Sequence, residues 1–118
     1  MKRRRRVAEV LGVRAEVADT FFSRLLGLMF RRSPPEPGSG LLITRCRSIH
    51  TLFMRFPIDA IFLDGDGSPV RVVRGIPPWR PFVWGGRRAT QVLELRAGEL
   101  EGLDFPGTPD NPKIPELR

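Results

Sequence analysis

His50, the only histidine of the chain, lies nine residues before Asp59, with a bend at Phe56-Pro57 between them. A carboxylate beside an imidazole raises the pKa of the imidazole and fixes its tautomer, so the two side chains are candidates for a general acid–base pair. If the flanking segments pair as a hairpin, the two side chains can meet. The alternative interpretation is that both side chains hydrogen-bond backbone groups and hold the shape of the bend.

A hydrolase-like enzyme built on His50 and Asp59 also needs a nucleophile and an oxyanion site. The hydroxyl and thiol groups nearest to His50 in the sequence belong to Cys46, Ser48 and Thr51. None of them stands in the sharp strand-to-helix turn that exposes a nucleophile, so we expect strand-end or buried residues at all three positions. The sequence therefore favours a binding domain over an enzyme.

A second class of site is a concave pocket with apolar and aromatic walls, in which one or two cations orient a ligand. The candidate residues are His50, Met54, Arg55, Asp59, Trp79 and Arg24. Their side chains predict a small anionic or sugar-like ligand. The alternative is that Met54 and Trp79 belong to the core, and that Arg24 forms an ion pair with Asp59 or Glu94.

We expect no metal site and no cofactor. Cys46 is the only cysteine, and one histidine with scattered carboxylates falls short of the clustered ligands that zinc requires. The run Asp64-Gly65-Asp66-Gly67 lacks the further ligands of a calcium loop and is typical of a hairpin turn, because glycine tolerates positive φ. The glycines form neither a GxGxxG nor a P-loop pattern, so nothing indicates nucleotide binding.

The basic residues are concentrated at the start of the chain. The 118 residues carry a net charge of +7, and five of the 20 basic residues lie in Lys2–Arg6. Because like charges repel, we expect residues 1–6 to form a flexible arm, which either keeps the protein in solution or contacts nucleic acid. No run approaches the ~18 apolar residues of a membrane span, and charges interrupt any export signal, so we expect no membrane association and a cytoplasmic location.

The elements that must position these residues are mostly short strands. Apolar residues at 22, 25, 26 and 29 follow one helical face, which predicts one buried amphipathic helix near residues 20–31. Strands are predicted over residues 8–17, 41–44, 48–55, 58–63, 70–76, 82–84 and 90–95, and one or two helical turns over 97–103. This pattern indicates a mainly β, α+β fold, a compact antiparallel β barrel or sandwich. Recurrent prolines predict an extended or disordered tail over 106–118.

Three motifs, in the same order, resemble those of one protein family. Ser48–Asp64, with the sequence SIHTLFMRFPIDAIFLD, is similar to the central stretch SIHTxFMxFPIDxxFLD of the family called domain of unknown function 192, an ancient conserved region of bacteria and archaea. Arg24–Arg31 resembles its RxxGLMxR helix, and Leu93–Gly98 resembles its LELPAG strand, with Arg96 in place of the proline. The resemblance covers residues 13–103. It implies one compact, mostly β domain, here residues 7–105, and no settled activity.

Overall fold

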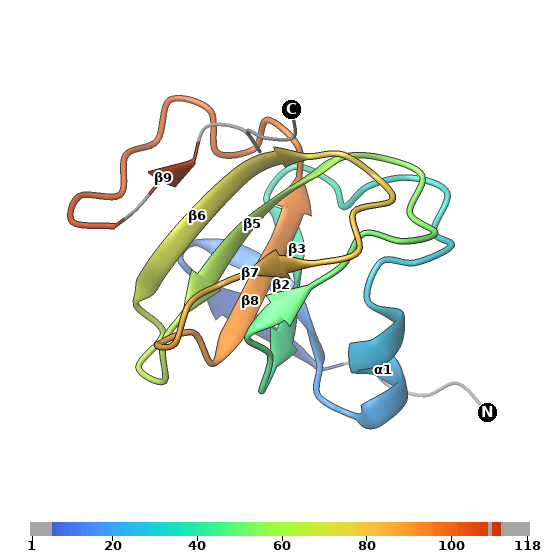
Figure 1. Ribbon diagram of the computed structural model, residues 1–118, viewed down its shortest axis with the longest axis horizontal. Coiled ribbons are helices and arrows are strands. Elements are labelled where there is room, and N and C mark those ends of the chain that lie inside the picture. The colour runs from blue at the N-terminus through green and yellow to red at the C-terminus, as the bar shows by residue number, and fades with distance from the viewer. Residues whose placement is uncertain (1–5, 109, 112–118) are drawn as a thin grey trace.

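The computed structural model describes residues 6–108 and 110–111, which form mostly short strands (Figure 1). In chain order, the elements are β1 (Val7–Val10), β2 (Val13–Ala18), α1 (Phe21–Leu26), β3 (Ser39–Thr44), β4 (Ser48–Ile49), β5 (Ile58–Leu63), β6 (Pro69–Ile76), β7 (Val83–Trp84), β8 (Gln91–Arg96) and β9 (Asp110–Asn111). The predicted mainly β fold with one helix is confirmed. The predicted basic arm and Pro-rich tail fall largely on residues 1–5, 109 and 112–118, which lie outside the described residues.

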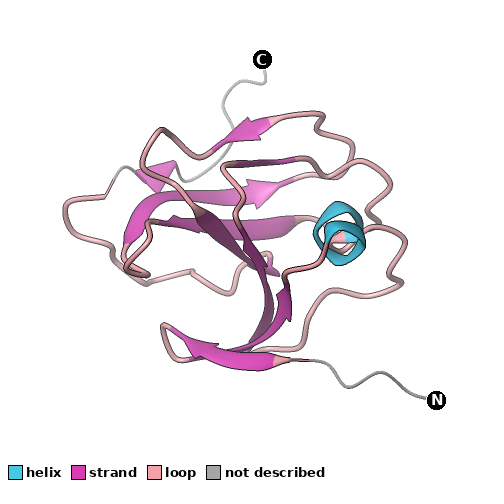
Figure 2. Cartoon of the chain, turned by 90° about the horizontal axis from the view of Figure 1, so that it is seen from below, coloured by secondary structure: helices cyan, strands magenta, loops and turns pink. Residues whose placement is uncertain are grey.

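Among the described residues, seven strands form one mixed sheet in the order β1-β2-β3-β8-β5-β6-β9, and β4 pairs with β7 in a separate ribbon. Most neighbouring strands are antiparallel, but β2 pairs with β3, and β6 with β9, in parallel. The prediction of an antiparallel sheet is wrong at these two pairs. Two neighbouring strands can run parallel only if a crossover connects them, and between β2 and β3 this crossover is α1 with the loop that follows it. The sheet is strongly curved but not closed into a barrel (Figure 2).

Side chains alternate along the strands, so the sheet has two apolar faces. Ile43 and Phe62 belong to a buried cluster on the first face, which also receives side chains from β4 and β7. Figure 1 shows these two strands crossing in front of the larger sheet. Leu42 and Ile61 belong to a second cluster on the opposite face, which Leu100 joins from the segment after β8. The parity of a residue in its strand therefore decides which cluster it enters.

Close contacts fix the loops around the β4–β7 ribbon. A Cβ at Gly85 would overlap the ring of Phe62, so only glycine lets the ribbon approach the first face so closely. Thr51 is fully buried, as the sequence suggested. Its hydroxyl donates to the carbonyl of Pro77 at 2.7 Å and accepts from the N–H of Arg80 at 2.8 Å. Thr51 thus joins the loop after β4 to the loop after β6, and its hydroxyl is a structural group.

The helix is shorter and more exposed than the sequence predicts. Thr20 caps it, because its hydroxyl accepts from the N–H of Ser23 at 3.1 Å. The helix ends after six residues at Gly27, which has a φ of 48°, and none of those six residues is buried. The prediction of a buried helix near residues 20–31 is therefore wrong: Phe22 is 70% exposed. Leu28, which follows the helix, is buried instead.

The predicted hairpin turn at residues 64–67 is confirmed. Asp64 Oδ1 accepts from the N–H of Ser68 at 3.0 Å and from that of Asp66 at 2.9 Å, and these donors hold the pKa of the Asp64 carboxyl below its ordinary value. Residues 97–102 form turns instead of the predicted helical segment. No helix within the described part of the chain is long and apolar enough to span a membrane.

Candidate ligand-binding cavity

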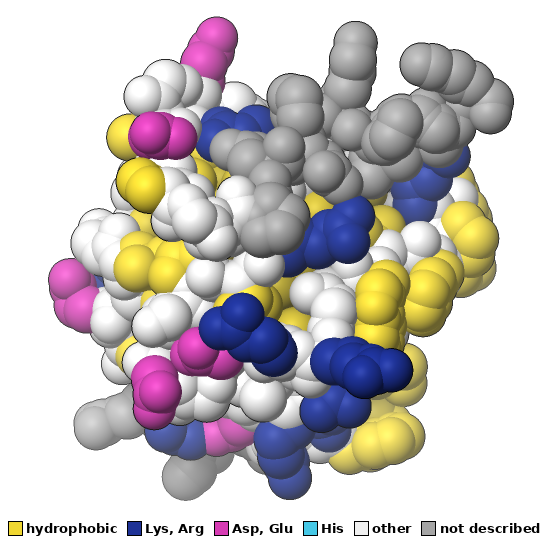
Figure 3. Space-filling model, turned by 60° about the vertical axis from the view of Figure 1, so that its left-hand side comes forward, with side chains coloured by type: hydrophobic (Ala, Val, Ile, Leu, Met, Phe, Trp, Pro, Cys, Tyr) yellow, Lys and Arg dark blue, Asp and Glu magenta, His cyan; other side chains and the backbone are white. Residues whose placement is uncertain are grey.

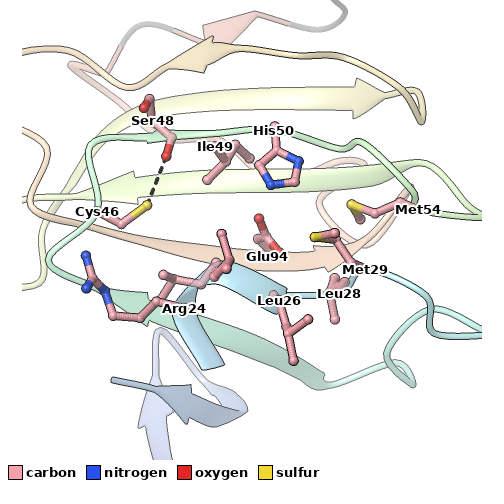
Figure 4. Close-up of a pocket in the computed structure, with 13 residues that line it drawn as sticks. Arg24, Leu26, Leu28, Met29, Cys46, Ser48, Ile49, His50, Met54 and Glu94 are labelled. Atoms are coloured by element: carbon pink, nitrogen blue, oxygen red, sulfur yellow. Dashed lines mark hydrogen bonds between the residues drawn. The ribbon is translucent and has the colours of Figure 1, made fainter. Parts of the chain in front are cut away.

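A cavity of about 120 Å³ lies between α1, β4 and the first face of the sheet (Figure 4). Its walls come from α1 with the residues after it, from β4 with its flanking loops, and from the central strands β3 and β8. The lining residues are Arg24, Leu25, Leu26, Gly27, Leu28, Met29, Ile43, Cys46, Ser48, Ile49, His50, Met54 and Glu94. An apolar cavity of about 150 Å³ holds benzene, so this one has room for a group of about five non-hydrogen atoms.

Glu94 brings a buried carboxyl group to this cavity. It lies two residues after Val92 in β8, so both side chains point to the first face of the sheet, and it is only 2% exposed. Its Oε1 has no hydrogen-bond partner among the described residues, and we call this atom the open oxygen of Glu94. Burial raises the pKa of the carboxyl to about 8, although the charge of Arg31 lowers it somewhat. Arg31 itself forms an ion pair with Glu16 at 3.2 Å. A buried polar atom without a partner destabilises a fold, so its presence requires an explanation.

The ring of His50 lies across the cavity from α1 (Figure 4). Its Nδ1 accepts a hydrogen bond from the N–H of Leu52 at 3.0 Å. In the neutral ring, the proton therefore resides on Nε2, which is then a donor. The cavity thus combines an open carboxyl oxygen from Glu94 with an N–H donor from His50.

Cys46 and Ser48 also line the cavity, and the Cys46 thiol is bound to the backbone of Ser48. Cys46 Sγ donates to the carbonyl of Ser48 at 3.0 Å (Figure 4). Burial raises the pKa of the Cys46 thiol, against the lowering effect of this hydrogen bond. The thiolate is the reactive form of cysteine, so a thiol with a raised pKa is a poor nucleophile at neutral pH.

Arg24 lines the cavity, but its guanidinium group is bound to the backbone. Nε donates to the carbonyl of Thr44 at 2.8 Å, and Nη2 donates to the carbonyl of Arg45 at 2.6 Å. The suggested ion pair of Arg24 with Asp59 or Glu94 is therefore wrong. The two contacts attach α1 to the end of β3, and so fix one wall of the cavity.

Asp59 lies on the opposite face of the sheet, where it binds backbone groups. Oδ1 accepts from the N–H of Gly75 at 2.8 Å, and Oδ2 accepts from those of Gly98 at 3.1 Å and Leu100 at 3.3 Å. A carboxylate with several such donors is well satisfied without a ligand. The structure therefore does not bring Asp59 and His50 together, and Asp59 does not orient the imidazole ring.

The remaining candidates, Met54, Arg55 and Trp79, line a second depression. This aromatic groove is formed by Phe30, Phe53, Met54, Arg55, Pro78 and Trp79. Trp79 is 57% exposed, which corrects its suggested place in the core, and its ring centroid lies 4.9 Å from that of Phe53. Met54 is buried and lines both the groove and the cavity. The predicted site thus divides between the cavity, the groove and the opposite face.

Metal binding has no geometric basis within residues 6–108 and 110–111, because no three His, Cys, Asp or Glu side chains there are grouped closely enough to hold an ion. His50 would in addition be a poor ligand in the tautomer that its contact with Leu52 imposes, since Nε2 then carries the proton.

Comparison with known proteins identifies the group to which this architecture belongs. The family model of domain of unknown function 192, described as an uncharacterised ancient conserved region, matches residues 3–107. The chain belongs to this family. A UPF0127 protein of Pyrococcus furiosus is 39% identical over 99 residues, which cover 77% of this chain and 80% of that protein. A UPF0127 protein of Thermococcus sibiricus is 36% identical over 94 residues, and here the match spans 77% of this chain but only 60% of the relative.

Two solved structures show the same fold as this member of the domain of unknown function 192 family. A protein of Sinorhizobium meliloti, described as a candidate transcription regulator, has a TM-score of 0.68 and 27% identity, and the match covers 75% of this chain and 71% of that protein. A protein of unknown function from Novosphingobium aromaticivorans has the same TM-score at 22% identity, with 75% and 66% covered. Neither comparison supplies an established activity.

The three family motifs meet at the cavity. The motif at Arg24–Arg31 supplies Leu28 and Met29, the central motif supplies His50 and Met54, and the last motif supplies Glu94. Sequence reasoning considered Glu94 only as an ion-pair partner and missed it as a site residue. The signal was its position two residues after Val92, which places an acidic side chain on the same apolar face of the strand.

Proposed function

We propose that the protein is a small ligand-binding domain and that the cavity is its binding site. The observation that carries this proposal is the open oxygen of Glu94, a residue that lines a cavity of about 120 Å³. His50 offers an N–H donor in the same space, so a ligand can donate to Glu94 and accept from His50. Apolar walls with a few convergent polar groups are typical of binding pockets.

These groups favour a ligand with a hydrogen-bond donor. A hydroxyl of a sugar-like molecule or an N–H group can donate to the open oxygen of Glu94. An anion has no hydrogen to donate to this oxygen and would be repelled by the carboxylate. The cation that could attract an anion, the guanidinium of Arg24, is already bound to the carbonyls of Thr44 and Arg45. The site therefore supports one part of the expected ligand chemistry, the hydroxyl, better than the anion.

Methionine methyl groups allow a direct test of the cavity. The chain has three methionines, of which Met29 and Met54 line the cavity and Met1 lies outside the described residues. We expect titration with small alcohols and amines, followed by NMR of ¹³C-methyl methionine, to shift the signals of Met29 and Met54 while the Met1 signal stays fixed. Titrations that leave the Met29 and Met54 signals unchanged would contradict a binding function at this site.

Two variants separate the cavity from the aromatic groove. His50→Ala removes the Nε2–H donor and should weaken binding by about tenfold, since a hydrogen bond to a buried donor contributes roughly 1 to 1.5 kcal/mol. Trp79→Ala alters only the groove and should leave the affinity of the cavity unchanged. A larger loss in Trp79→Ala than in His50→Ala would assign binding to the groove.

Association with nucleic acid is a second candidate function. It is favoured by the basic residues Lys2–Arg6 and by the structural similarity to a protein described as a candidate transcription regulator. Figure 3 also shows several Lys and Arg side chains gathered on one face, beside a band of hydrophobic side chains. This function requires the cytoplasmic location expected from the sequence. Deletion of residues 1–6 should abolish binding to duplex DNA, and binding that survives with the same salt dependence would rule out the arm.

A further inference from the structure

The carboxyl of Glu94 is the least satisfied charged group among the buried side chains described. It sits in β8 at the centre of the sheet, only 2% exposed, and no described atom bonds to its Oε1. The only other buried acidic side chain of the described residues, Asp59, has three backbone donors. Glu94 therefore has the desolvation of a buried acid without the contacts that normally offset it.

The charged and titratable groups around Glu94 do not neutralise it. From α1, Arg24 points its guanidinium to the carbonyls of Thr44 and Arg45. From the segment after α1, Arg31 lies close enough to favour ionisation but pairs with Glu16 of β2. From the flanks of β4, Cys46 and His50 line the same cavity, and both are neutral in the hydrogen bonds that they make.

The walls next to this carboxyl suit a short hydrocarbon chain. Leu28, Ile43 and Met54 are each at most 4% exposed, and all of them line the cavity. Figure 4 shows the thioethers of Met29 and Met54 side by side near the Glu94 carboxyl. Thioether chains are flexible and fill irregular space, so these walls can adapt to stems of different shape.

We propose that the ligand of this cavity is a small organic cation, a primary ammonium group on a short apolar stem that pairs with Glu94; this inference rests on the proposed binding function. An ammonium group donates to the open oxygen and supplies the opposite charge that the site lacks. A hydroxyl ligand would satisfy the hydrogen bond but supply no opposite charge, and a neutral side chain at position 94 would serve it equally well. A cation makes use of the charge that a carboxylate carries, which a neutral ligand does not.

Binding of an ammonium ion involves one proton. Where the Glu94 carboxyl is protonated, the incoming R–NH3⁺ pairs with the carboxylate and the carboxyl proton leaves to solvent, so charge and atoms balance. Affinity should then rise by about tenfold per pH unit as pH increases toward 8, and level off above this value. A neutral ligand releases no proton, and its affinity does not rise in this way.

Three probes of similar size test the proposal on the full chain. n-Butylammonium, 1-butanol and butyrate each place about five or six non-hydrogen atoms in the cavity and differ in charge. Calorimetry and the methyl signals of Met29 and Met54 report their binding. We expect n-butylammonium to bind at least about tenfold more tightly than 1-butanol at pH 8 or above, with affinity that falls toward pH 6.

Glu94→Gln is the matched variant, because glutamine keeps the shape of the side chain and removes its charge. We expect it to lose about tenfold or more of the n-butylammonium affinity and to keep that of 1-butanol. Equal binding of the amine and the alcohol to the native protein would overturn the ammonium proposal and leave the binding function intact. Binding of butyrate alone would likewise overturn the ammonium proposal and leave the binding function intact. If none of the three probes binds, both the ammonium proposal and the proposed binding function are overturned. The pH profile of the native protein decides the matter even if Glu94→Gln does not fold.

Discussion

Asp59 and Glu94 lie on paired strands at the centre of the sheet, and their side chains point to opposite faces. The antiparallel register places Asp59 opposite Leu95 and Ala60 opposite Glu94, so the two acids are diagonal neighbours across β5 and β8. One carboxylate accepts three backbone N–H groups, while the other has an oxygen without a partner in the described part of the chain. The first therefore stabilises the fold, and the second is the group to which we propose that a ligand binds.

Asp59→Asn should destabilise the protein without affecting the cavity. The carboxylate ties the N–H groups of Gly75, Gly98 and Leu100 together, and an amide cannot accept from all three. We expect a loss of about 3 kcal/mol in the free energy of unfolding, measured by urea denaturation. Asp66→Asn, in the exposed hairpin turn, is the control and should change stability little. Similar losses in both variants would show that Asp59 has no special structural role.

Glu94 should make stability fall as pH rises. Its pKa is about 8 in the folded protein and 4.5 ordinarily, so between these values the folded chain holds a proton that the unfolded chain does not. Stability is then greatest below the lower pKa and decreases by at most roughly 1.4 kcal/mol per pH unit until the upper one. Glu94→Gln removes this dependence, so urea denaturation should show its stability rising relative to the native protein across this window. Parallel pH profiles would contradict the burial of an ionisable acid.

Thr51→Val should weaken the attachment between the loops after β4 and β6. Valine has nearly the same shape but leaves the buried carbonyl of Pro77 and the N–H of Arg80 without the hydroxyl of Thr51. We expect a loss of about 2 kcal/mol, seen as a lower Tm in thermal unfolding. Thr90→Val, at an exposed position, should have almost no effect. An unchanged Tm in Thr51→Val would mean that other contacts hold these loops.

Gly85→Ala should disrupt the packing of the β4–β7 ribbon on the sheet. The added methyl group would overlap the buried ring of Phe62, which has no room to move in a closely packed core. We expect destabilisation by about 2 kcal/mol or more in chemical denaturation. Gly65→Ala is the matched control, because no described atom lies within 4 Å of its added Cβ. Equal stability of the two variants would refute the close approach at Gly85.

The strands were largely predictable from the sequence, whereas the burial of the helix was not. β5 was predicted with its observed limits, because Ile58–Leu63 is a β-prone run bounded by a proline and a strong turn. The helix was predicted from apolar spacing that continues past Gly27. Because Gly27 adopts positive φ, the chain turns there, and the apolar side chains of α1 stay exposed instead of facing a core.

The site was predicted in part, because its residues come from segments far apart in the chain. His50, Met54 and Arg24 do line the cavity, but Asp59 enters the opposite face. Strand parity and register decide such placements, and register depends on tertiary pairing. Glu94 could have been found from its position two residues after Val92, on the same face of the strand, but its proximity to His50 depends on how β4 crosses the sheet.

The crossover between β2 and β3 forms one wall of the cavity and is little buried. None of the residues of α1 is buried, and Arg24 and Leu28 provide its main anchors. The segment can therefore open by itself while the strand pairs of the sheet stay formed, as local unfolding does in many proteins. Backbone amides of residues 21–30 should accordingly exchange their hydrogens with solvent much faster than those of β5 and β8. Movement of this wall of the cavity is then governed by a local opening equilibrium, independently of the global stability of the fold.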